Sequence, residues 1–390
     1  MEFEFTESQL AVRDAVARIC TRFPDSYWLE KDVKHEFPHE FARAIAEGGF
    51  LGMRVPEEFG GSGLGYTEVA LMMQAIAESG ACLAGCTAVH VNMFVPGSIL
   101  KYGTEEQKAR WIHKLMTLED RAAFGVTEPD AGIDTTHIQT RAEWNPARQK
   151  YLIFGQKVWI SAAQVANKIM LLARTAPIDK TERPIDGLSL FYTDLDKSHA
   201  EVREMAKMGR HAVDSNQIFF DAMPVAREDL IGEEGKGLYY LFDSLNPERI
   251  LVAAECVGIG RAALRRATQY AGERIVFGRP IGKNQAIQHP LAAAWCNLEA
   301  ANLMAFKAAS LCDKGKSCGA EANAAKWLAA EAGFEACEQA LLTHGGMGYA
   351  QEFHVERYLR EAQILRITPI TGPLILSYIA ERVLGLPKSY

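Results

Sequence analysis

The sequence has no Cys-x-x-Cys pair, no basic excess and no apolar run approaching the roughly 18 residues of a membrane span. Its eight cysteines lie mostly in apolar stretches, where a buried thiol is the ordinary state, so we expect neither disulfides nor zinc or another metal. A net charge of −7 gives no broad attraction to nucleic acid. The segment Met1–Phe5 lacks the basic flank of a signal peptide. We therefore expect a cytoplasmic protein with no nucleic-acid partner and no membrane span.

The length of 390 residues exceeds what a single hydrophobic core usually holds, which predicts two or three structural units. Hydrophobic residues make up 48% and charged residues 23%, an ordinary globular composition. Residues 1–118 are rich in Ala, Glu, Leu and Met, with apolar residues at helical spacing, as across Val69–Ile76. Pro24, Pro38 and a glycine-rich segment after Pro56 interrupt this pattern. An N-terminal α-helical domain is predicted over residues 1–118.

Residues 119–228 have a different character, with short segments enriched in β-branched and aromatic residues. These segments are Ile138–Glu143, Tyr151–Phe154, Val158–Ile160, Ile169–Ala173, Gly187–Tyr192 and Gln217–Ala222. Because no helical pattern of about ten residues alternates with them, an antiparallel β barrel or sandwich is favoured over a parallel sheet.

Residues 229–390 return to long, alanine-rich amphipathic stretches, at about 249–272, 285–313, 319–345 and 373–384. Four such helices on short loops indicate a bundle. The predicted fold class is therefore α+β multidomain, with an N-terminal helical domain, a middle antiparallel β barrel or sandwich and a C-terminal four-helix bundle.

Two segments carry candidate chemistry, and the first is Gly125–Asp134, which reads Gly-Val-Thr-Glu-Pro-Asp-Ala-Gly-Ile-Asp. Backbone N–H groups freed by small residues, together with the Thr127 hydroxyl, are able to hydrogen-bond the polar edge of a planar heterocycle. In isolation, an ordinary turn rich in Gly, Pro and Asp explains the segment better.

The second segment is Gly155–Ser161, which indicates a strand leaving a turn. Side chains alternate along a strand, so Trp159 and Ser161 fall on one face. An aromatic wall beside a hydroxyl donor suits a flavin ring. A core tryptophan followed by a strand-end serine is the alternative.

The order and spacing of these two segments, in a β domain between helical ones, resembles the acyl-CoA dehydrogenase family. The resemblance covers essentially the whole chain and includes Glu273–Gly278, Ile281–Gln285, His344–Gly348 and the Arg360-Glu361 pair. Any one of these matches could arise by chance, whereas their common register makes another fold improbable.

The resemblance implies an FAD enzyme that takes the α-proton of an acyl-CoA thioester, passes the β-hydride to flavin N5 and gives its electrons to an electron-transferring flavoprotein. It assigns FAD contacts to Phe124, Val126, Thr127, Trp159, Ser161, Arg274, Phe277, Gln285, Gly345, Gly346 and Thr371. In the family, Arg274, Phe277, Gln285 and the Gly345-Gly346 backbone meet FAD across a subunit interface. This implies a homotetramer (a dimer of dimers) or a homodimer.

Several of these positions also have ordinary structural explanations. Arg274 suits a surface helix, Gln285 a helix N-terminus, and Gly345-Gly346 a helix C-cap that at the same time lets a pyrophosphate approach.

The catalytic base must be a carboxylate in a dehydrated pocket, where burial raises its pKa toward the working pH. Many family members carry this glutamate in a loop near the C-terminus, and the matching residue here is Pro369, which cannot accept a proton. Isovaleryl- and long-chain-type members instead place it on a helix, directly before an arginine. Glu248, followed by Arg249, matches that arrangement, so we predict Glu248 as the base.

The local structure around Glu248 has two interpretations. Pro247 either begins the helix, capped by Asn246, or kinks a helix that begins near Leu238. Only the first places Glu248 at a helix N-terminus, where an exposed glutamate needs no catalytic explanation.

The resemblance also indicates residues near the substrate. We expect Asn246 and Arg249 to contact it, together with Ile133, which stands where the family usually has serine. Leu342 replaces a glutamine common before the double glycine.

Two other functions remain open from the sequence. An acyl-CoA oxidase or flavin monooxygenase of the same fold would react with oxygen, and a catalytically silent binding protein would lack flavin. The sequence identifies neither the acyl chain nor the pathway.

Overall fold

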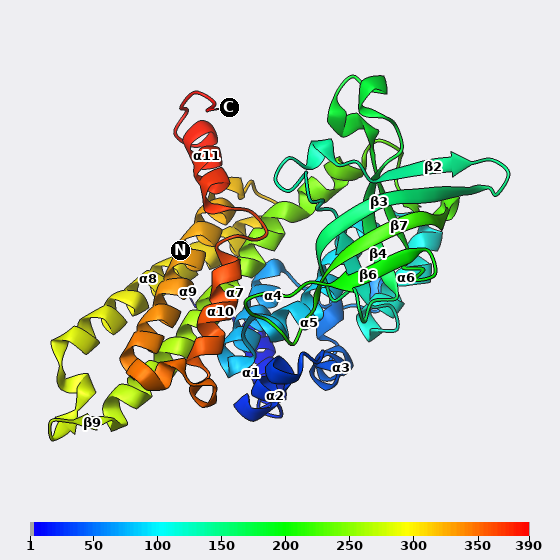
Figure 1. Cartoon of the computed structure of the whole chain (residues 1–390). Coiled ribbons are helices and arrows are strands. Elements are labelled where there is room, and N and C mark those ends of the chain that lie inside the picture. The colour runs from blue at the N-terminus through cyan, green and yellow to red at the C-terminus, as the bar shows by residue number, and fades with distance from the viewer. Residues whose placement is uncertain (1–3, 390) are drawn as a thin grey trace.

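A computed structural model describes residues 4–389 and shows a helical region, a β region and a second helical region in chain order. The sheet lies at one side of the molecule and the long C-terminal helices at the other, with the N-terminal helices between and below them (Figure 1). The predicted α+β architecture, helical then β then helical, is confirmed.

The N-terminal region, from residue 4 on, contains six α-helices, and a longer segment with two 3-10 helices, Phe50–Gly52 and Glu57–Phe59, joins the third to the fourth. They are α1 (Glu7–Cys20), α2 (Asp25–Lys34), α3 (His39–Glu47), α4 (Tyr66–Ile76), α5 (Cys82–Tyr102) and α6 (Glu105–Thr117). Thr6 and Thr104 close capping boxes at the starts of α1 and α6, which satisfies backbone N–H groups that a helix leaves unpaired. Pro24 and Pro38 stand just before α2 and α3, so the predicted breakers mark real helix boundaries.

The stretch Tyr66–Tyr102, which contains α4 and α5, is long and apolar enough to cross a membrane by composition. However, 83% of its most apolar window is buried inside the protein. Its apolar character therefore reflects packing in the core.

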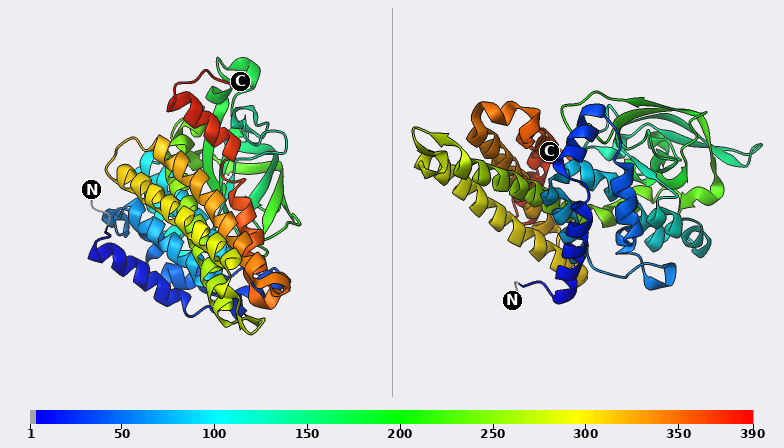
Figure 2. Two further views of the ribbon diagram at one scale, coloured as in Figure 1. Left: turned by 90° about the vertical axis from the view of Figure 1, so that its left-hand side faces the viewer. Right: turned by 90° about the horizontal axis from the view of Figure 1, so that it is seen from below.

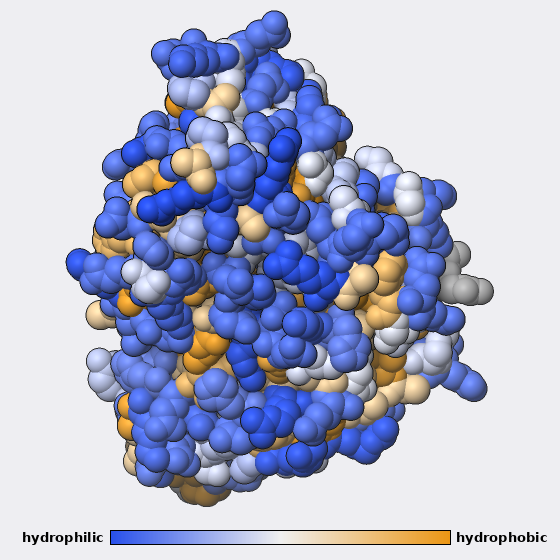
Figure 3. Space-filling view, turned by 90° about the vertical axis from the view of Figure 1, so that its right-hand side faces the viewer, coloured by the Kyte–Doolittle hydropathy of each residue, from blue (hydrophilic) through white to orange (hydrophobic). Residues whose placement is uncertain are grey.

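The middle region forms one eight-stranded sheet. Its strands are β1 (Ala122–Gly125), β2 (Arg141–Asn145), β3 (Lys150–Ser161), β4 (Lys168–Arg174), β5 (Leu188–Asp194), β6 (Ala200–Glu204), β7 (Ser215–Ala226) and β8 (Leu230–Ile231). They run in the order β6-β7-β3-β2-β4-β5-β8, with β1 beside β4. On this side the surface is mostly hydrophilic, with separate apolar patches (Figure 3).

The sheet differs from the prediction in two respects. First, it is mixed, because β1 and a single residue pair of β2 run parallel to β4, while the other pairings within residues 4–389 are antiparallel. Second, Tyr151–Phe154 and Val158–Ile160 belong to the single strand β3. Two register shifts against β7 interrupt its alternation, after Ile153 and after Lys157, which is why its sequence looks like two shorter strands.

The C-terminal region contains α7 (Gly237–Glu273), α8 (Gln285–Asp313), α9 (Gly319–His344), α10 (Val355–Leu365) and α11 (Gly372–Arg382). A hairpin of β9 (Ile275–Val276) and β10 (Arg279–Pro280) joins α7 to α8. The long helices lie side by side (Figure 2). A Cβ atom at Gly333 would lie 2.6 Å from the Cys256 carbonyl oxygen, so the close approach of α9 to α7 requires glycine there.

Helix α7 decides between the two interpretations of Pro247. It is continuous from Gly237 to Glu273 with Pro247 inside it. Glu248 therefore lies within the helix, and the interpretation in which Pro247 begins the helix is wrong. Pro247 is buried within the helix, where it lacks one backbone N–H.

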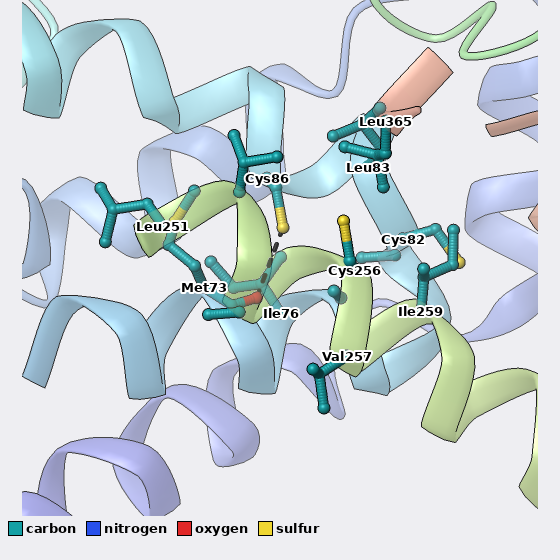
Figure 4. Packing of buried hydrophobic residues seen from close by; sticks show 14 of the residues in the cluster. Met73, Ile76, Cys82, Leu83, Cys86, Leu251, Cys256, Val257, Ile259 and Leu365 are labelled. Carbon is teal, nitrogen blue, oxygen red and sulfur yellow. Dashed lines mark hydrogen bonds between the residues drawn. The ribbon is translucent and has the colours of Figure 1, made fainter. Parts of the chain in front are cut away.

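The largest hydrophobic core joins the N-terminal and C-terminal helices into one unit. Figure 4 shows its centre, where side chains of α4, α5 and α7 meet and the Cys86 thiol donates to the Met73 carbonyl over 3.4 Å. All eight cysteines are free, and six are buried or nearly so. Burial raises the pKa of Cys20 to about 11.

Candidate active site

One face of helix α5 organises the candidate site. Thr87, His90 and Phe94 are three, four and seven residues apart, a spacing that places side chains on the same side of a helix. Each contacts a different part of the site: Thr87 accepts from Arg210, His90 bonds Glu248, and Phe94 packs edge-on against Phe124 at 5.0 Å between ring centroids.

Glu248 projects from α7 toward this face of α5. Its Oε2 atom lies 2.8 Å from His90 Nε2, and its side chain keeps 20% of its exposure. The other ring nitrogen, His90 Nδ1, lies 2.8 Å from Oε1 of Glu255, which is only 2% exposed. The predicted base is therefore one of two carboxylates bound to a single imidazole.

Two carboxylates around one ring change the charge state of His90. Burial alone lowers the pKa of His90, but Glu248 and Glu255 outweigh it and raise the pKa well above the ordinary value of 6.5. An ionised carboxylate only accepts hydrogen bonds, so each ring nitrogen donates while the carboxylate that faces it is ionised. This arrangement favours the imidazolium form of His90, while burial raises the pKa of Glu255 above its ordinary value of 4.5.

The loop after β1 carries Val126 and Thr127, both half-buried. The Val126 carbonyl accepts from Lys157 Nζ at 2.9 Å, and the Thr127 carbonyl accepts from the Val158 amide at 2.9 Å. Both contacts fasten the loop to β3, the strand that continues to Trp159 and Ser161. The two segments singled out in the sequence are therefore adjacent in space.

Trp159 lies at the second register shift of β3, with a positive φ of 63°. Its side chain is 53% exposed although both neighbours in the chain are buried. Ser161 is half-buried, and its Oγ accepts from Arg210 Nη2 at 3.2 Å. The irregular strand β3 thus exposes the Trp159 ring, and the Ser161 hydroxyl two residues later contacts the Arg210 guanidinium.

Arg210 is a site residue that the sequence reasoning missed. It lies between β6 and β7, also donates to Ser215, and adopts a positive φ of 58°. Non-glycine residues in this conformation are uncommon and often functional. The local signal in the sequence is only an arginine beside histidine in a Gly-Arg-His turn, which does not single it out.

The predicted substrate residues are differently placed. Arg249 Nη1 donates to Asn246 Oδ1 at 2.9 Å, one turn earlier on α7. Arg249 Nε is buried without a hydrogen-bond partner within residues 4–389, and burial lowers the pKa of its guanidinium. Ile133 is 61% exposed on the loop between β1 and β2. A buried donor without a partner beside Glu248 is what an incoming polar group would satisfy.

The remaining cofactor candidates lie elsewhere. Arg274, Phe277, Gln285, Gly345 and Gly346 are exposed, around the β9–β10 hairpin, the start of α8 and the end of α9. The hairpin forms the end of the molecule farthest from the sheet (Figure 1). One chain therefore does not bring these residues to Trp159 and Ser161.

Thr371 stands directly before α11 and is half-buried. The neighbouring Ile370 carbonyl accepts from Lys326 Nζ at 2.7 Å, which fixes this loop against α9. Pro369 occupies the position of the family's loop acid, so no carboxylate is available at that point.

The residues present fit FAD. Trp159 offers an exposed aromatic face on a hydrogen-bonded strand, next to the Ser161 hydroxyl. At Gly345 and Gly346, no atom lies within 4 Å of where a Cβ would stand, which leaves exposed backbone that a phosphate could approach. Among residues 4–389, no group of three His, Cys, Asp or Glu side chains is arranged to hold a metal ion.

Comparison with known families matches three consecutive parts of the chain. Residues 6–119 match the acyl-CoA dehydrogenase N-terminal domain, residues 123–223 the middle domain and residues 235–384 the C-terminal domain. Acyl-CoA dehydrogenase FadE12 of Mycobacterium tuberculosis is 37% identical over 99% of this chain and 98% of its own length.

Solved structures agree along the whole chain. A chain from a study of the electron transferring flavoprotein of Acidaminococcus fermentans has a TM-score of 0.92 at 31% identity, over 98% of this chain and 100% of that chain. The glutaryl-coenzyme A dehydrogenase glutaryl-CoA complex has a TM-score of 0.91 at 30% identity, with coverages of 100% and 98%. The FAD complex of PigA has a TM-score of 0.90 at 26% identity, with coverages of 99% and 100%.

Full-length similarity at this level, with three matched domains in order and a site suited to flavin, establishes the family. The chain is an FAD-binding oxidoreductase that belongs to the acyl-CoA dehydrogenase family.

Proposed function

We propose that this enzyme converts an acyl-CoA thioester to the 2-enoyl-CoA, with Glu248 as the base. The observation that carries the proposal is the placement of Glu248. Its Oε2 is bound by His90, while its Oε1 has no hydrogen-bond partner within residues 4–389 and is free to take a proton. The other candidate position for the base, in the loop before α11, holds Pro369, which cannot accept a proton.

The reaction breaks two C–H bonds of the acyl chain. Glu248 Oε1 accepts the proton from the carbon next to the thioester carbonyl. FAD, when bound, would supply the acceptor for the hydride of the adjacent carbon, and loss of the proton and the hydride would convert the substrate to the 2-enoyl thioester. Asn246 and Arg249, including the unpartnered Nε of Arg249, lie beside the base and orient the substrate through polar contacts.

We also propose that FAD is held by two copies of the chain. Phe124, Val126, Thr127, Trp159, Ser161 and Thr371 contribute from one copy, and Arg274, Phe277, Gln285, Gly345 and Gly346 contribute from its neighbour. The exposed position of the second group at the opposite end of the molecule supports this arrangement. A homotetramer, as a dimer of dimers, or a homodimer would complete the site.

Three further assignments belong to this proposal. The electrons pass from FAD to an electron-transferring flavoprotein, the enzyme works in the cytoplasm, and the chain divides into units over residues 1–118, 119–228 and 229–390.

The test is anaerobic mixing of the purified flavoprotein with a panel of acyl-CoA thioesters, following loss of flavin absorbance. We expect bleaching by at least one thioester, and a reduction rate about 10²- to 10⁴-fold lower in Glu248→Gln. Glu352→Gln, at an exposed position, serves as the control and keeps the wild-type rate. Wild-type bleaching in Glu248→Gln would overturn the base assignment.

The same preparation separates the alternatives. Slow reoxidation of the bleached flavin in air indicates a dehydrogenase, whereas rapid reoxidation indicates an oxidase or monooxygenase. A purified protein without flavin absorbance would support a binding protein instead.

A further inference from the structure

The contacts of His90 reach beyond the proposed base. The imidazole lies between α5 and α7 and bridges Glu248 and Glu255, which are seven residues apart on α7 and so share one helix face. Side-chain exposure falls along this line, from 20% at Glu248 through 11% at His90 to 2% at Glu255. One end of the line faces the proposed reaction and the other lies in the core.

We propose that His90 and Glu255 are positioning residues that hold Glu248 in its reactive orientation, with a fixed positive charge behind the base. This inference rests on the proposed function, in which Glu248 removes the proton. Glu255 holds the imidazole through Nδ1, and the imidazole then donates from Nε2 to Glu248 Oε2. The free Oε1 of Glu248 is thereby directed away from the imidazole, toward the substrate side.

The geometry gives each member a distinct role. A glutamate side chain has three rotatable bonds, and ordering it costs conformational entropy that the enzyme otherwise spends in each turnover. The buried hydrogen bond to His90 removes that freedom before substrate arrives. Glu255 is needed because an imidazole with only one partner would rotate about its own side-chain bonds.

The positive charge also opposes desolvation of the base. A carboxylate that loses water on substrate binding favours its protonated, inactive form. An imidazolium at 2.8 Å favours the ionised form that accepts a proton. Glu255 favours this protonated form of His90 from the buried side.

The surroundings contain few other charges. Arg210, from the turn between β6 and β7, faces Glu255, and Arg249 on α7 faces Glu248. The Cys86 thiol of α5 also lies near Glu255, and burial raises its pKa so far that it stays neutral. The imidazolium is therefore the one cation in direct hydrogen-bond contact with Glu248 within residues 4–389.

The test uses the FAD-loaded enzyme and three variants, Glu248→Gln, His90→Gln and Glu255→Gln. We expect His90→Gln to lower the maximal rate of flavin reduction about 10²-fold, the loss typical of a displaced catalytic group, with acyl-CoA affinity little changed. Any part of the wild-type pH profile that follows loss of the His90 proton, whose pKa lies well above 6.5, is absent from this variant because glutamine does not titrate. The maximal rate of flavin reduction in Glu255→Gln is expected to lie between that of wild type and that of His90→Gln.

Glu361→Gln is the matched control. Glu361 is also fully buried and also contacts α5, where it accepts from the Ala84 amide, but its ionic partner is Arg357. This variant is expected to lose stability while its pH profile stays that of wild type. A shift shared by Glu361→Gln and Glu255→Gln would assign both effects to general loss of packing and overturn the proposal.

A second measurement does not depend on variant folding. Exchange of the imidazole C2 hydrogen, followed by mass spectrometry, reports the protonation of individual histidines in the wild-type holoenzyme. We expect His90 to remain protonated well above pH 6.5. Loss of the His90 proton near the ordinary value of pH 6.5 in the wild-type enzyme would overturn the proposal.

The outcomes separate this inference from the proposed function. If Glu248→Gln keeps the wild-type reduction rate, the base assignment itself fails. If Glu248→Gln is inactive while His90→Gln keeps the wild-type rate and pH profile, the base assignment stands and the positioning role is wrong.

Discussion

Glu128 and Lys157 form an ion pair inside the protein that joins the two segments proposed to bind FAD. The Nζ–Oε1 distance is 2.9 Å, Lys157 has no exposed side-chain surface, and Glu128 is 6% exposed. Glu128 also accepts from the amides of Gln139 and Thr140. The loop that carries Val126 and the strand that carries Trp159 thus share one fully satisfied polar contact.

We expect Glu128→Gln to destabilise the enzyme, because it leaves Lys157 buried without a charge partner. Breaking a buried pair typically costs about 3–5 kcal/mol, whereas loss of an exposed pair costs about 0–1 kcal/mol. Denaturant unfolding at pH 7 measures the difference, with Glu143→Gln, from the exposed pair with Arg141, as control. Equal effects of the two variants would contradict the structural role of Glu128.

The pH dependence of this variant follows from the sign of the shift. Burial raises the pKa of Glu128, but Lys157 and the two amides outweigh burial and hold the pKa below its ordinary value of 4.5. A lowered pKa contributes stability that is present above pH 4.5 and is lost as the pH falls through the folded-state value. Wild type should therefore lose more stability on acidification below pH 4.5 than Glu128→Gln.

Replacement of Trp159 by alanine should weaken FAD binding. An aromatic stack contributes about 1 kcal/mol beyond buried area, which corresponds to about a fivefold change in Kd. Trp159→Phe should retain most of the affinity, and Trp144→Ala, on β2, should leave it unchanged. Titration of the flavin-free protein with FAD measures these constants, and wild-type affinity in Trp159→Ala would remove the residue from the cofactor site.

Phe277→Arg should disrupt subunit assembly. The Phe277 side chain is fully exposed in the single chain, so the substitution leaves folding intact, while burial of a phenylalanine at an interface contributes about 1.5–3 kcal/mol. We expect a smaller assembly mass by light scattering and loss of FAD on gel filtration. Val33→Arg, at another exposed apolar position, should retain both. Unchanged mass would place the interface elsewhere.

Arg210→Gln should make the reduction potential of bound FAD more negative, because it removes a cation that contacts Ser161 beside the predicted flavin position. For a two-electron couple, each 1.4 kcal/mol of lost stabilisation corresponds to about 30 mV. Arg203→Gln, in an exposed pair with Glu201, is the control. An unchanged or more positive potential in Arg210→Gln would contradict the charge argument.

Local pattern predicted most of the elements. The helix at 285–313 and the strand at Ile169–Ala173 agree with α8 and β4, because their periodicity is long or their composition strongly β-branched. Helix α7 begins much earlier than the expected 249, since Pro247 suggested a boundary that packing overrides. Short strands such as β8 depend on pairing partners and have no local signal.

The candidate site likewise contains parts that a local sequence pattern predicts and parts that depend on contacts between distant residues. The segments around Thr127 and Trp159 are readable because each is a compact motif. The bridge from His90 to Glu255 joins positions 165 residues apart, so no spacing rule finds it. The signal was present in another form, as a histidine and a glutamate within apolar helices, where a buried charge requires a partner.

Helix α7 carries Glu248 within its first half and is followed by its C-cap residue Arg274, 26 residues later or about 39 Å along the helix axis. Each residue turns an α-helix by about 100°, so inserting or deleting one residue between them would swing one side chain round the axis relative to the other. The number of residues between Glu248 and Arg274 therefore fixes the direction of the proposed base relative to the hairpin, so a one-residue insertion or deletion there would disturb both parts of the site.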